Sequence, residues 1–154
     1  MAETLIAVIG AAECEPFVAT MAAEVGRGIA DMGATLICGG RSGVMEAASG
    51  GAKERGGRTI GILPGDKPFP GNPHIDVHIL TNLGAARNGI IVQSAAVVIA
   101  VGGGYGTLSE IALALKAGKT VIGLATWDIP GVHLVQTPTD ALGAAAEAIA
   151  RATL

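Results

Sequence analysis

Short apolar runs alternate along the chain with longer segments of helical periodicity. Each apolar run is bounded by Gly, Pro or polar residues and has the length of a buried strand. The predicted strands are Leu5–Ile9, Thr35–Cys38, Thr59–Leu63, Val77–Leu80, Ala95–Val101, Thr120–Leu124 and His133–Val135. The predicted helices are Pro16–Met32, Gly43–Arg55, Leu83–Ser94, Leu108–Ala117 and Pro138–Ala152.

The predicted strands are continuously apolar rather than alternating, which indicates a sheet covered on both faces. We therefore predict an α/β fold with three layers, α/β/α, around a mostly parallel central sheet of about seven strands. Gly33, Gly56 and Gly118 each follow a predicted helix, where a left-handed cap is favoured. The irregular, Pro-rich segment Pro64–His74 is expected to be a loop at the sheet edge.

Glycines gather where three of the predicted strands end. The three turns are Gly10; Gly39, Gly40, Arg41, Ser42 and Gly43; and Gly102, Gly103, Gly104, Tyr105, Gly106 and Thr107. A strand that turns at once into a helix exposes free backbone N–H groups and the positive end of the helix dipole. Ligands of open parallel sheets bind at this edge, so the turns predict a site for a phosphorylated ligand. A single such turn has a purely structural explanation as well.

Two familiar nucleotide motifs are incomplete. Thr107 stands where a G-x-G-x-x-G sequence needs its third glycine, which disfavours a nicotinamide or flavin site. Gly118, Lys119 and Thr120 resemble the end of a phosphate-binding P-loop, but they close a predicted helix and begin a strand instead of joining strand to helix. A dehydrogenase and a P-loop NTPase are therefore not predicted.

Length and composition narrow the classes of protein further. The 154 residues fit a single domain, 1–154, and a chain that is 50% hydrophobic and 15% charged favours self-association. A formal net charge of -3 argues against nucleic-acid binding. Cys14 and Cys38 match no metal or redox spacing and are interpreted as small apolar fillers. The sequence shows no signal-peptide pattern and no apolar stretch long enough to span a membrane, so we expect a cytoplasmic protein without membrane association. No zinc-binding pattern surrounds His74 and His78, so we expect no metal site.

Four ordered motifs resemble one known family. They are Gly39–Glu46, Thr59–Pro64, Arg87 with Asn88, and Gly102–Glu110. This set is similar to the Lonely Guy superfamily, also described as possible lysine decarboxylases, and resembles most the short bacterial proteins similar to the molybdenum cofactor carrier protein. Those proteins keep three glycines where the hydrolases usually have Pro-Gly-Gly. The resemblance covers nearly the whole chain and implies a Rossmann-like nucleotide- or phosphate-binding domain that forms homodimers or homotetramers.

The resemblance also implies a chemistry. Lonely Guy enzymes cleave the N-glycosidic bond of nucleoside 5'-monophosphates with an Arg and a Glu that match Arg87 and Glu110, the two candidate catalytic residues. A carboxylate stabilises the oxocarbenium character of that reaction, and a guanidinium holds phosphate or assists the leaving base. The chain departs from the hydrolases at Asn88, which replaces a second basic residue, and at Gly102, which replaces their Pro. These departures favour binding without cleavage.

Several candidate residues have alternative interpretations that need no ligand. Thr107 to Glu110 has the sequence of a capping box, in which Glu110 serves its own helix. Arg87 also suits a salt bridge or an oligomer contact, and Ser42 suits a helix N-cap. Met45 is expected in the core rather than in a pocket.

The function predicted from the sequence is a carrier that binds a phosphorylated heterocycle, either molybdenum cofactor or a related nucleotide. It would need no cofactor of its own, and molybdenum cofactor would be cargo. The alternative is a nucleoside 5'-monophosphate phosphoribohydrolase that releases a base and ribose 5-phosphate. An oligomeric protein with a vestigial anion site remains a third interpretation.

Overall fold

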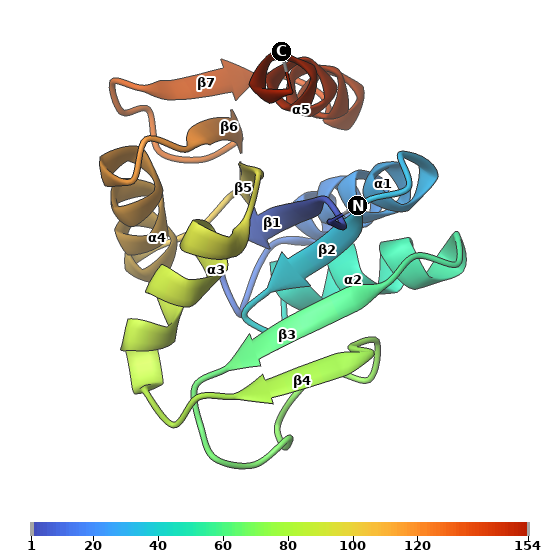
Figure 1. Ribbon diagram of the computed structural model, residues 1–154, viewed down its shortest axis with the longest axis vertical. Coiled ribbons are helices and arrows are strands. Elements are labelled where there is room, and N and C mark those ends of the chain that lie inside the picture. Colours follow the sequence, from blue (N-terminus) through green and yellow to red (C-terminus); the bar gives the residue numbers. More distant parts are fainter. Residues whose placement is uncertain (1, 154) are drawn as a thin grey trace.

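The computed structural model describes residues 2–153 and contains one seven-stranded sheet (Figure 1). The strands are β1 Leu5–Ile9, β2 Thr35–Cys38, β3 Thr59–Leu63, β4 Val77–Leu80, β5 Val97–Val101, β6 Thr120–Leu124 and β7 Val132–Val135. Their order across the sheet is β4-β3-β2-β1-β5-β6-β7, and every neighbouring pair is parallel. The predicted fold class is confirmed.

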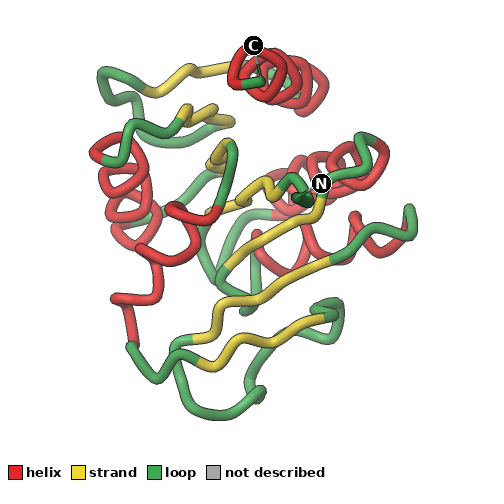
Figure 2. The backbone as a smooth tube through the Cα atoms, in the orientation of Figure 1, coloured by secondary structure: helices red, strands yellow, loops and turns green. Residues whose placement is uncertain are grey.

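Helices cover both faces of this sheet (Figures 1 and 2). They are α1 Pro16–Asp31, α2 Val44–Glu54, the 3-10 helix η1 Gly84–Arg87, α3 Asn88–Ser94, α4 Tyr105–Lys116 and α5 Pro138–Ala152. In β1, Ile6 and Val8 belong to the core beneath α1, α2 and α5, whereas Ala7 and Ile9 belong to the core beneath α3 and α4. This two-sided burial explains why the strands are apolar without alternation. Within residues 2–153 no helix has the length and apolarity that a bilayer crossing requires.

The order of the strands reverses between β1 and β5. The chain adds β2, β3 and β4 on one side of β1, then crosses the sheet through α3 and adds β5, β6 and β7 on the other side. The connections that leave the carboxyl ends of β1 and β5 therefore diverge, and a crevice opens between them. The strand order alone therefore predicts a ligand site at the carboxyl ends of β1 and β5.

Small residues let α1 and α2 approach each other closely. A Cβ atom added to Gly26 of α1 would lie 1.9 Å from the Ala48 carbonyl oxygen, and one added to Gly51 of α2 would lie 2.1 Å from the Ala23 carbonyl oxygen. The backbones of the two helices thus touch at Gly and Ala positions. The start of α2 is tied to the turn after β1, because the Val44 amide donates to the Ala11 carbonyl at 3.0 Å.

Two predicted helices differ from those observed. The segment Leu83–Ser94 is not one helix: it forms η1 and then α3, and its change of pitch falls between Arg87 and Asn88. The predicted helix Leu108–Ala117 begins three residues earlier, at Tyr105, directly after the N-cap Gly104. Low helix propensity at Gly106 suggests a later start, but the first turn makes no intrahelical N–H bonds and tolerates such residues.

The remaining boundaries agree closely with the sequence. The predicted strand Ala95–Val101 is shorter and begins at Val97, and the predicted strand at His133 begins at Val132. Gly33, Gly56 and Gly118 have φ values of 75°, 71° and 76°, as expected of residues that follow a helix in the left-handed region.

The predicted loop Pro64–His74 is confirmed as a loop between β3 and β4, and it reaches back to the turn after β2. Its buried residue Asn72 makes the connection. The Asn72 amide donates to the Gly40 carbonyl at 2.9 Å, and its side-chain Nδ2 donates to the Arg41 carbonyl at 2.8 Å. The loop therefore holds the glycine turn that precedes α2.

Candidate anion-binding site

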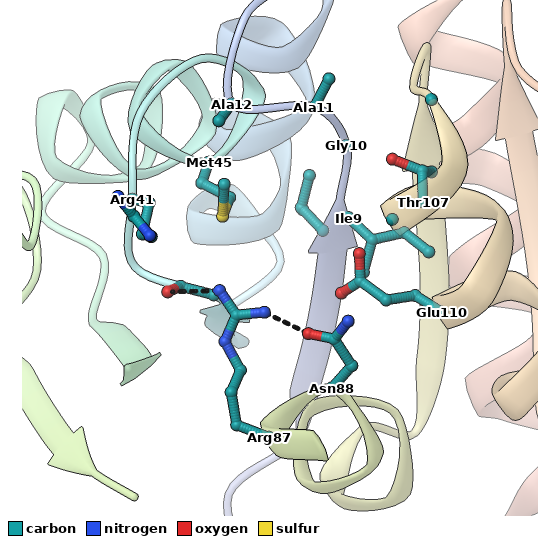
Figure 3. A pocket seen from close by; sticks show the side chains of 14 residues that line it. Ile9, Gly10, Ala11, Ala12, Arg41, Met45, Arg87, Asn88, Thr107 and Glu110 are labelled. Atoms are coloured by element: carbon teal, nitrogen blue, oxygen red, sulfur yellow. Dashed lines mark hydrogen bonds between the residues drawn. The ribbon is translucent and has the colours of Figure 1, made fainter. Parts of the chain in front are cut away.

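A cavity of about 400 Å³ lies at the carboxyl end of β1, between the turns that follow β2 and β5. Figure 3 shows its side chains, with Arg41 and Arg87 facing Glu110 and Thr107 across the end of β1. The lining residues are Val8, Ile9, Gly10, Ala11, Ala12, Gly39, Arg41, Met45, Arg87, Asn88, Gly104, Gly106, Thr107 and Glu110. All three predicted glycine turns contribute to it.

The cavity brings together about half of the residues singled out in the sequence. Those that line it are Gly10, Gly39, Arg41, Arg87, Gly104, Gly106, Thr107 and Glu110. Those that do not are Gly40, Ser42, Gly43, Gly102, Gly103 and Tyr105. Gly102 and Gly103 instead line a neighbouring cavity on the α1 side, which shares Ala11 and Gly104 with the first. The turn after β5 therefore forms the wall between two cavities.

Six lining residues were not predicted for the site, namely Val8, Ile9, Ala11, Ala12, Met45 and Asn88. Met45 is buried, as predicted, but its side chain also borders the cavity. Ile9 forms part of the floor as the last residue of β1. Asn88, considered only as a departure from the hydrolases, lies between Arg87 and Glu110 (Figure 3). The sequence indicates this position of Asn88 only through its place next to Arg87.

The start of α4 provides backbone donors at the cavity. Gly104 caps this helix and has no side chain to satisfy the N–H groups of the first turn. Gly104, Gly106 and Thr107 all line the cavity. Free amides and the positive end of a helix dipole favour an anion at this place.

The hydroxyl of Thr107 is buried without a partner. Within residues 2–153, Thr107 Oγ1 is the one buried side-chain oxygen or nitrogen atom that has no hydrogen-bond partner. Thr107 is 2% exposed and lies in the first turn of α4, so the capping-box interpretation is wrong: Gly104 is the N-cap and Thr107 bonds no amide. A buried, unpaired hydroxyl in a cavity wall is suited to bind a ligand atom.

Arg87 is held by main-chain oxygens rather than by a carboxylate. Its Nε donates to the Ile62 carbonyl at 2.8 Å, its Nη2 to the Gly39 carbonyl at 3.4 Å, and its Nη1 to the side-chain oxygen of Asn88. Burial lowers the pKa of the Arg87 guanidinium, and the nearby Glu110 carboxyl raises it. The salt-bridge interpretation is not supported, because no ion pair of Arg87 occurs within residues 2–153.

The turn after β2 contributes Arg41 but not Ser42. The Ser42 hydroxyl donates to the Ala12 carbonyl at 2.9 Å, which ties the turns after β1 and β2 together. The interpretation of Ser42 as an N-cap is wrong, since α2 is capped by Gly43, whose φ of 66° suits glycine. Arg41 is exposed, lines the cavity and adds a second guanidinium opposite the start of α4.

Among residues 2–153, Glu110 is the one residue with a carboxyl group that lines this cavity. It is 8% exposed, and burial raises its pKa from 4.5 to about 7 although the Arg87 charge lowers it. Within residues 2–153, no Lys or Arg nitrogen lies within ion-pair distance of its carboxylate. Burial thus favours the neutral form of Glu110, which repels an anion less than an ordinary carboxylate does.

The cysteines and histidines lie apart from this chemistry. Cys38 is fully buried in the core, where burial raises the pKa of its thiol. It is not only the small apolar filler that the sequence predicts, because its Sγ accepts from the Gly40 amide at 3.3 Å and lies 3.6 Å from Ser49 Oγ. Cys14 is half-buried and lines the cavity on the α1 side. Within residues 2–153, no three His, Cys, Asp or Glu side chains are grouped to hold a metal ion.

The chain belongs to the SLOG cluster4 family, whose model matches residues 3–151. It is 49% identical over 138 residues to an uncharacterized protein of Archaeoglobus fulgidus, a match that covers 89% of this chain and 91% of that protein. The expected kinship with Lonely Guy-like proteins is confirmed.

Two solved structures are also closely similar. The molybdenum cofactor binding protein of the phototrophic bacterium Rippkaea orientalis is 40% identical, with a TM-score of 0.92 over 97% of this chain and 99% of that chain. The molybdenum cofactor carrier protein of Chlamydomonas reinhardtii is 41% identical, with a TM-score of 0.89 over the same shares of the two chains. The relatives that the sequence motifs pointed to are therefore confirmed.

The raised pKa of Glu110 predicts a pH-dependent stability. The folded protein holds this proton more tightly than the unfolded chain, so the free energy of unfolding falls as pH rises from about 4.5 to about 7 and then levels. In Glu110→Gln this titration is absent. Urea denaturation should show that the stability of the variant relative to the wild type increases by about 2 kcal/mol between pH 5 and pH 8. Parallel pH profiles for the two proteins would contradict this assignment.

Proposed function

We propose that this member of the SLOG cluster4 family is a carrier that binds a phosphorylated heterocycle, molybdenum cofactor, without breaking a bond in it. The observation that carries the proposal is the set of hydrogen-bond donors at one cavity, among which the Thr107 hydroxyl has no protein partner. The free amides at the start of α4, the unpaired Thr107 hydroxyl and two guanidinium groups all line the same space. The similarity to molybdenum cofactor carrier and binding proteins supports the identity of the cargo.

Each group has a distinct task in this proposal. The first turn of α4 and the Thr107 hydroxyl bind the phosphate oxygens, where helix dipole and hydrogen bonds act together. Arg87 and Arg41 approach the phosphate from the β2 side of the cavity. Glu110, when protonated, donates a hydrogen bond to the ligand. The heterocycle occupies the rest of the cavity, next to the apolar side chain of Ile9.

The charges of the cavity are balanced in favour of an anion. Two arginines lie opposite the positive end of a helix dipole, and the Glu110 carboxyl group has a pKa of about 7. Charge-assisted hydrogen bonds to phosphate are stronger than neutral ones, and guanidinium suits phosphate geometry. A neutral heterocycle without phosphate would leave the Thr107 hydroxyl and the first amides of α4 unpaired, at a cost in affinity.

Thr107→Val tests the proposal directly. Valine keeps the shape but removes a buried hydroxyl that has no protein partner, so we expect the ligand-free variant to be about 1 kcal/mol more stable in urea denaturation. Calorimetric titration with molybdenum cofactor under anoxic conditions should show about tenfold weaker binding, because a hydrogen bond to a charged oxygen is lost.

Thr107→Ser is the matched control for this substitution. It retains the hydroxyl and should bind the cofactor nearly as the wild type does. A wild type that fails to bind molybdenum cofactor, or a Thr107→Val protein of unchanged affinity, would refute the assigned role of the cavity.

Glycosidic cleavage is the second candidate function, since Arg87 and Glu110, which match the Arg and Glu of the Lonely Guy enzymes, both line one cavity. We predict that the purified protein, incubated with AMP and related nucleoside monophosphates, releases no base above the level of a Glu110→Ala control. The physical reason is Asn88, a neutral residue between Arg87 and Glu110, which cannot protonate a leaving base. Chromatographic detection of free base measures the reaction, and steady turnover that is lost in Glu110→Ala would overturn the carrier assignment.

We further propose that the chain assembles into a homodimer or homotetramer. Leu83, the N-cap of η1, and Ile90 of α3 are 52% and 36% exposed, whereas Ile91 of α3 is buried against the sheet. Large apolar side chains that are exposed near one another favour burial against another subunit.

Light scattering tests this assembly. At micromolar concentration we expect a mass of two or four times 15.2 kDa, and Ile90→Glu should shift it toward 15.2 kDa because a charge would be buried at the interface. A monomeric wild type would refute the proposal.

A further inference from the structure

We propose that Thr126 and Trp127, in the loop after β6, are positioning residues that fix the peptide groups of the glycine turn at the anion site. This inference rests on the proposed function. Neither residue lines the cavity, so each acts through the turn and not on the ligand. We call residues 125–127 the support segment.

The support segment binds two carbonyl oxygens of the turn. Thr126 Oγ1 donates to the Gly102 carbonyl at 2.6 Å, and the Trp127 indole Nε1 donates to the Gly104 carbonyl at 3.0 Å. In a trans peptide the carbonyl and the following N–H point in opposite directions. Holding these carbonyls therefore directs the N–H groups of Gly103 and Tyr105 away from the support segment. Neither of these two residues lines the cavity, but Gly104, which lies between them, does.

Glycine is the reason such support is needed. Gly102 and Gly103 have φ values of 60° and 114°, and residues without a Cβ have many accessible conformations. A turn of this composition loses more conformational entropy when it becomes ordered than other sequences do. If external hydrogen bonds order the turn in the free protein, the ligand does not have to provide that ordering, and binding is tighter.

The support segment is itself held in place. The Gly102 amide donates to the Leu124 carbonyl at 2.9 Å, at the end of β6. Ala125 has a φ of 48°, an uncommon conformation for a residue other than glycine, which persists where surrounding contacts enforce it. The methyl group of Thr126 packs over Gly123, where an added Cβ would lie 2.7 Å from Thr126 Cγ2. The loop therefore has the fixed geometry that a support requires.

An aromatic pair adds to this support. The rings of Tyr105 and Trp127 stack with centroids 6.1 Å apart and planes 27° apart, although Tyr105 is 83% exposed. Trp127 thus contacts both Tyr105, the first residue of α4, and the carbonyl of the N-cap residue Gly104. Trp127 is the single tryptophan of the chain, so its fluorescence reports on the turn.

The test uses variants that remove one donor at a time with little change of shape. Thr126→Val loses the hydroxyl, and Thr126→Ser retains it as the matched control. Trp127→Phe keeps an aromatic ring for stacking on Tyr105 but loses the indole N–H. We expect Thr126→Val with Trp127→Phe to bind molybdenum cofactor about tenfold more weakly, and Thr126→Ser to bind it as the wild type does.

A second measurement needs no ligand. In the ligand-free double variant, the NMR order parameters of the Gly103 and Tyr105 amides should fall from about 0.85 toward 0.6, while those of the Gly39 and Arg41 amides stay unchanged. A general loss of stability would change both turns alike. Wild-type order parameters at Gly103 and Tyr105 in the double variant would overturn the inference.

The two measurements separate this inference from the proposed function. If the wild type binds no molybdenum cofactor but the variant amides become mobile, the proposed function fails and the positioning role stands. If the wild type binds and the double variant binds equally well, the positioning role fails and the carrier function stands.

Discussion

Unpaired backbone amides at the start of α4 are the constraint on which the rest of the site depends. Every helix leaves its first N–H groups without intrahelical partners, and most helices satisfy them with a capping side chain or water. Here the cap is Gly104, and the nearby Thr107 hydroxyl is also unpaired. Because the strand order reverses between β1 and β5, these donors face a crevice instead of the core. The anion site thus follows from topology before any charged residue is added.

Close packing around small residues turns this crevice into a shaped cavity. A Cβ added to Gly10 would lie 2.5 Å from Val44 Cγ1, and one added to Gly39 would lie 2.7 Å from Arg87 Nη2. The guanidinium of Arg87 can therefore lie against the turn after β2 only because that turn has no side chain there. In this part of the chain, glycines allow neighbouring segments and side chains to pack closely, and this matters more than the flexibility that they add. Arg87 is fixed by the same contact that brings it to the cavity.

The sequence predicts the fold well because burial on two faces leaves a clear pattern. The runs Leu5–Ile9 and Thr59–Leu63 match strands residue for residue, since only buried strands need such continuous apolar segments. The start of α4 and the break before Asn88 were not predicted, because tertiary contacts override weak local propensities there. Which glycines face the cavity also could not be predicted. Gly104 lines it and Gly103 does not. The direction in which a residue faces is predicted from whether its side chain is polar or apolar, and glycine has no side chain.

A carrier and a hydrolase of this fold would use the same residues. The two functions therefore differ in the interactions that these residues make. An enzyme needs interactions that strengthen only as charge develops in the transition state. In this protein Arg87 already donates to two carbonyls and to Asn88, and the Glu110 carboxyl has a pKa near neutrality. The neutral Asn88 beside them supplies no proton to a leaving base. Groups arranged in this way stabilise a bound ground state, which is the property that a carrier requires.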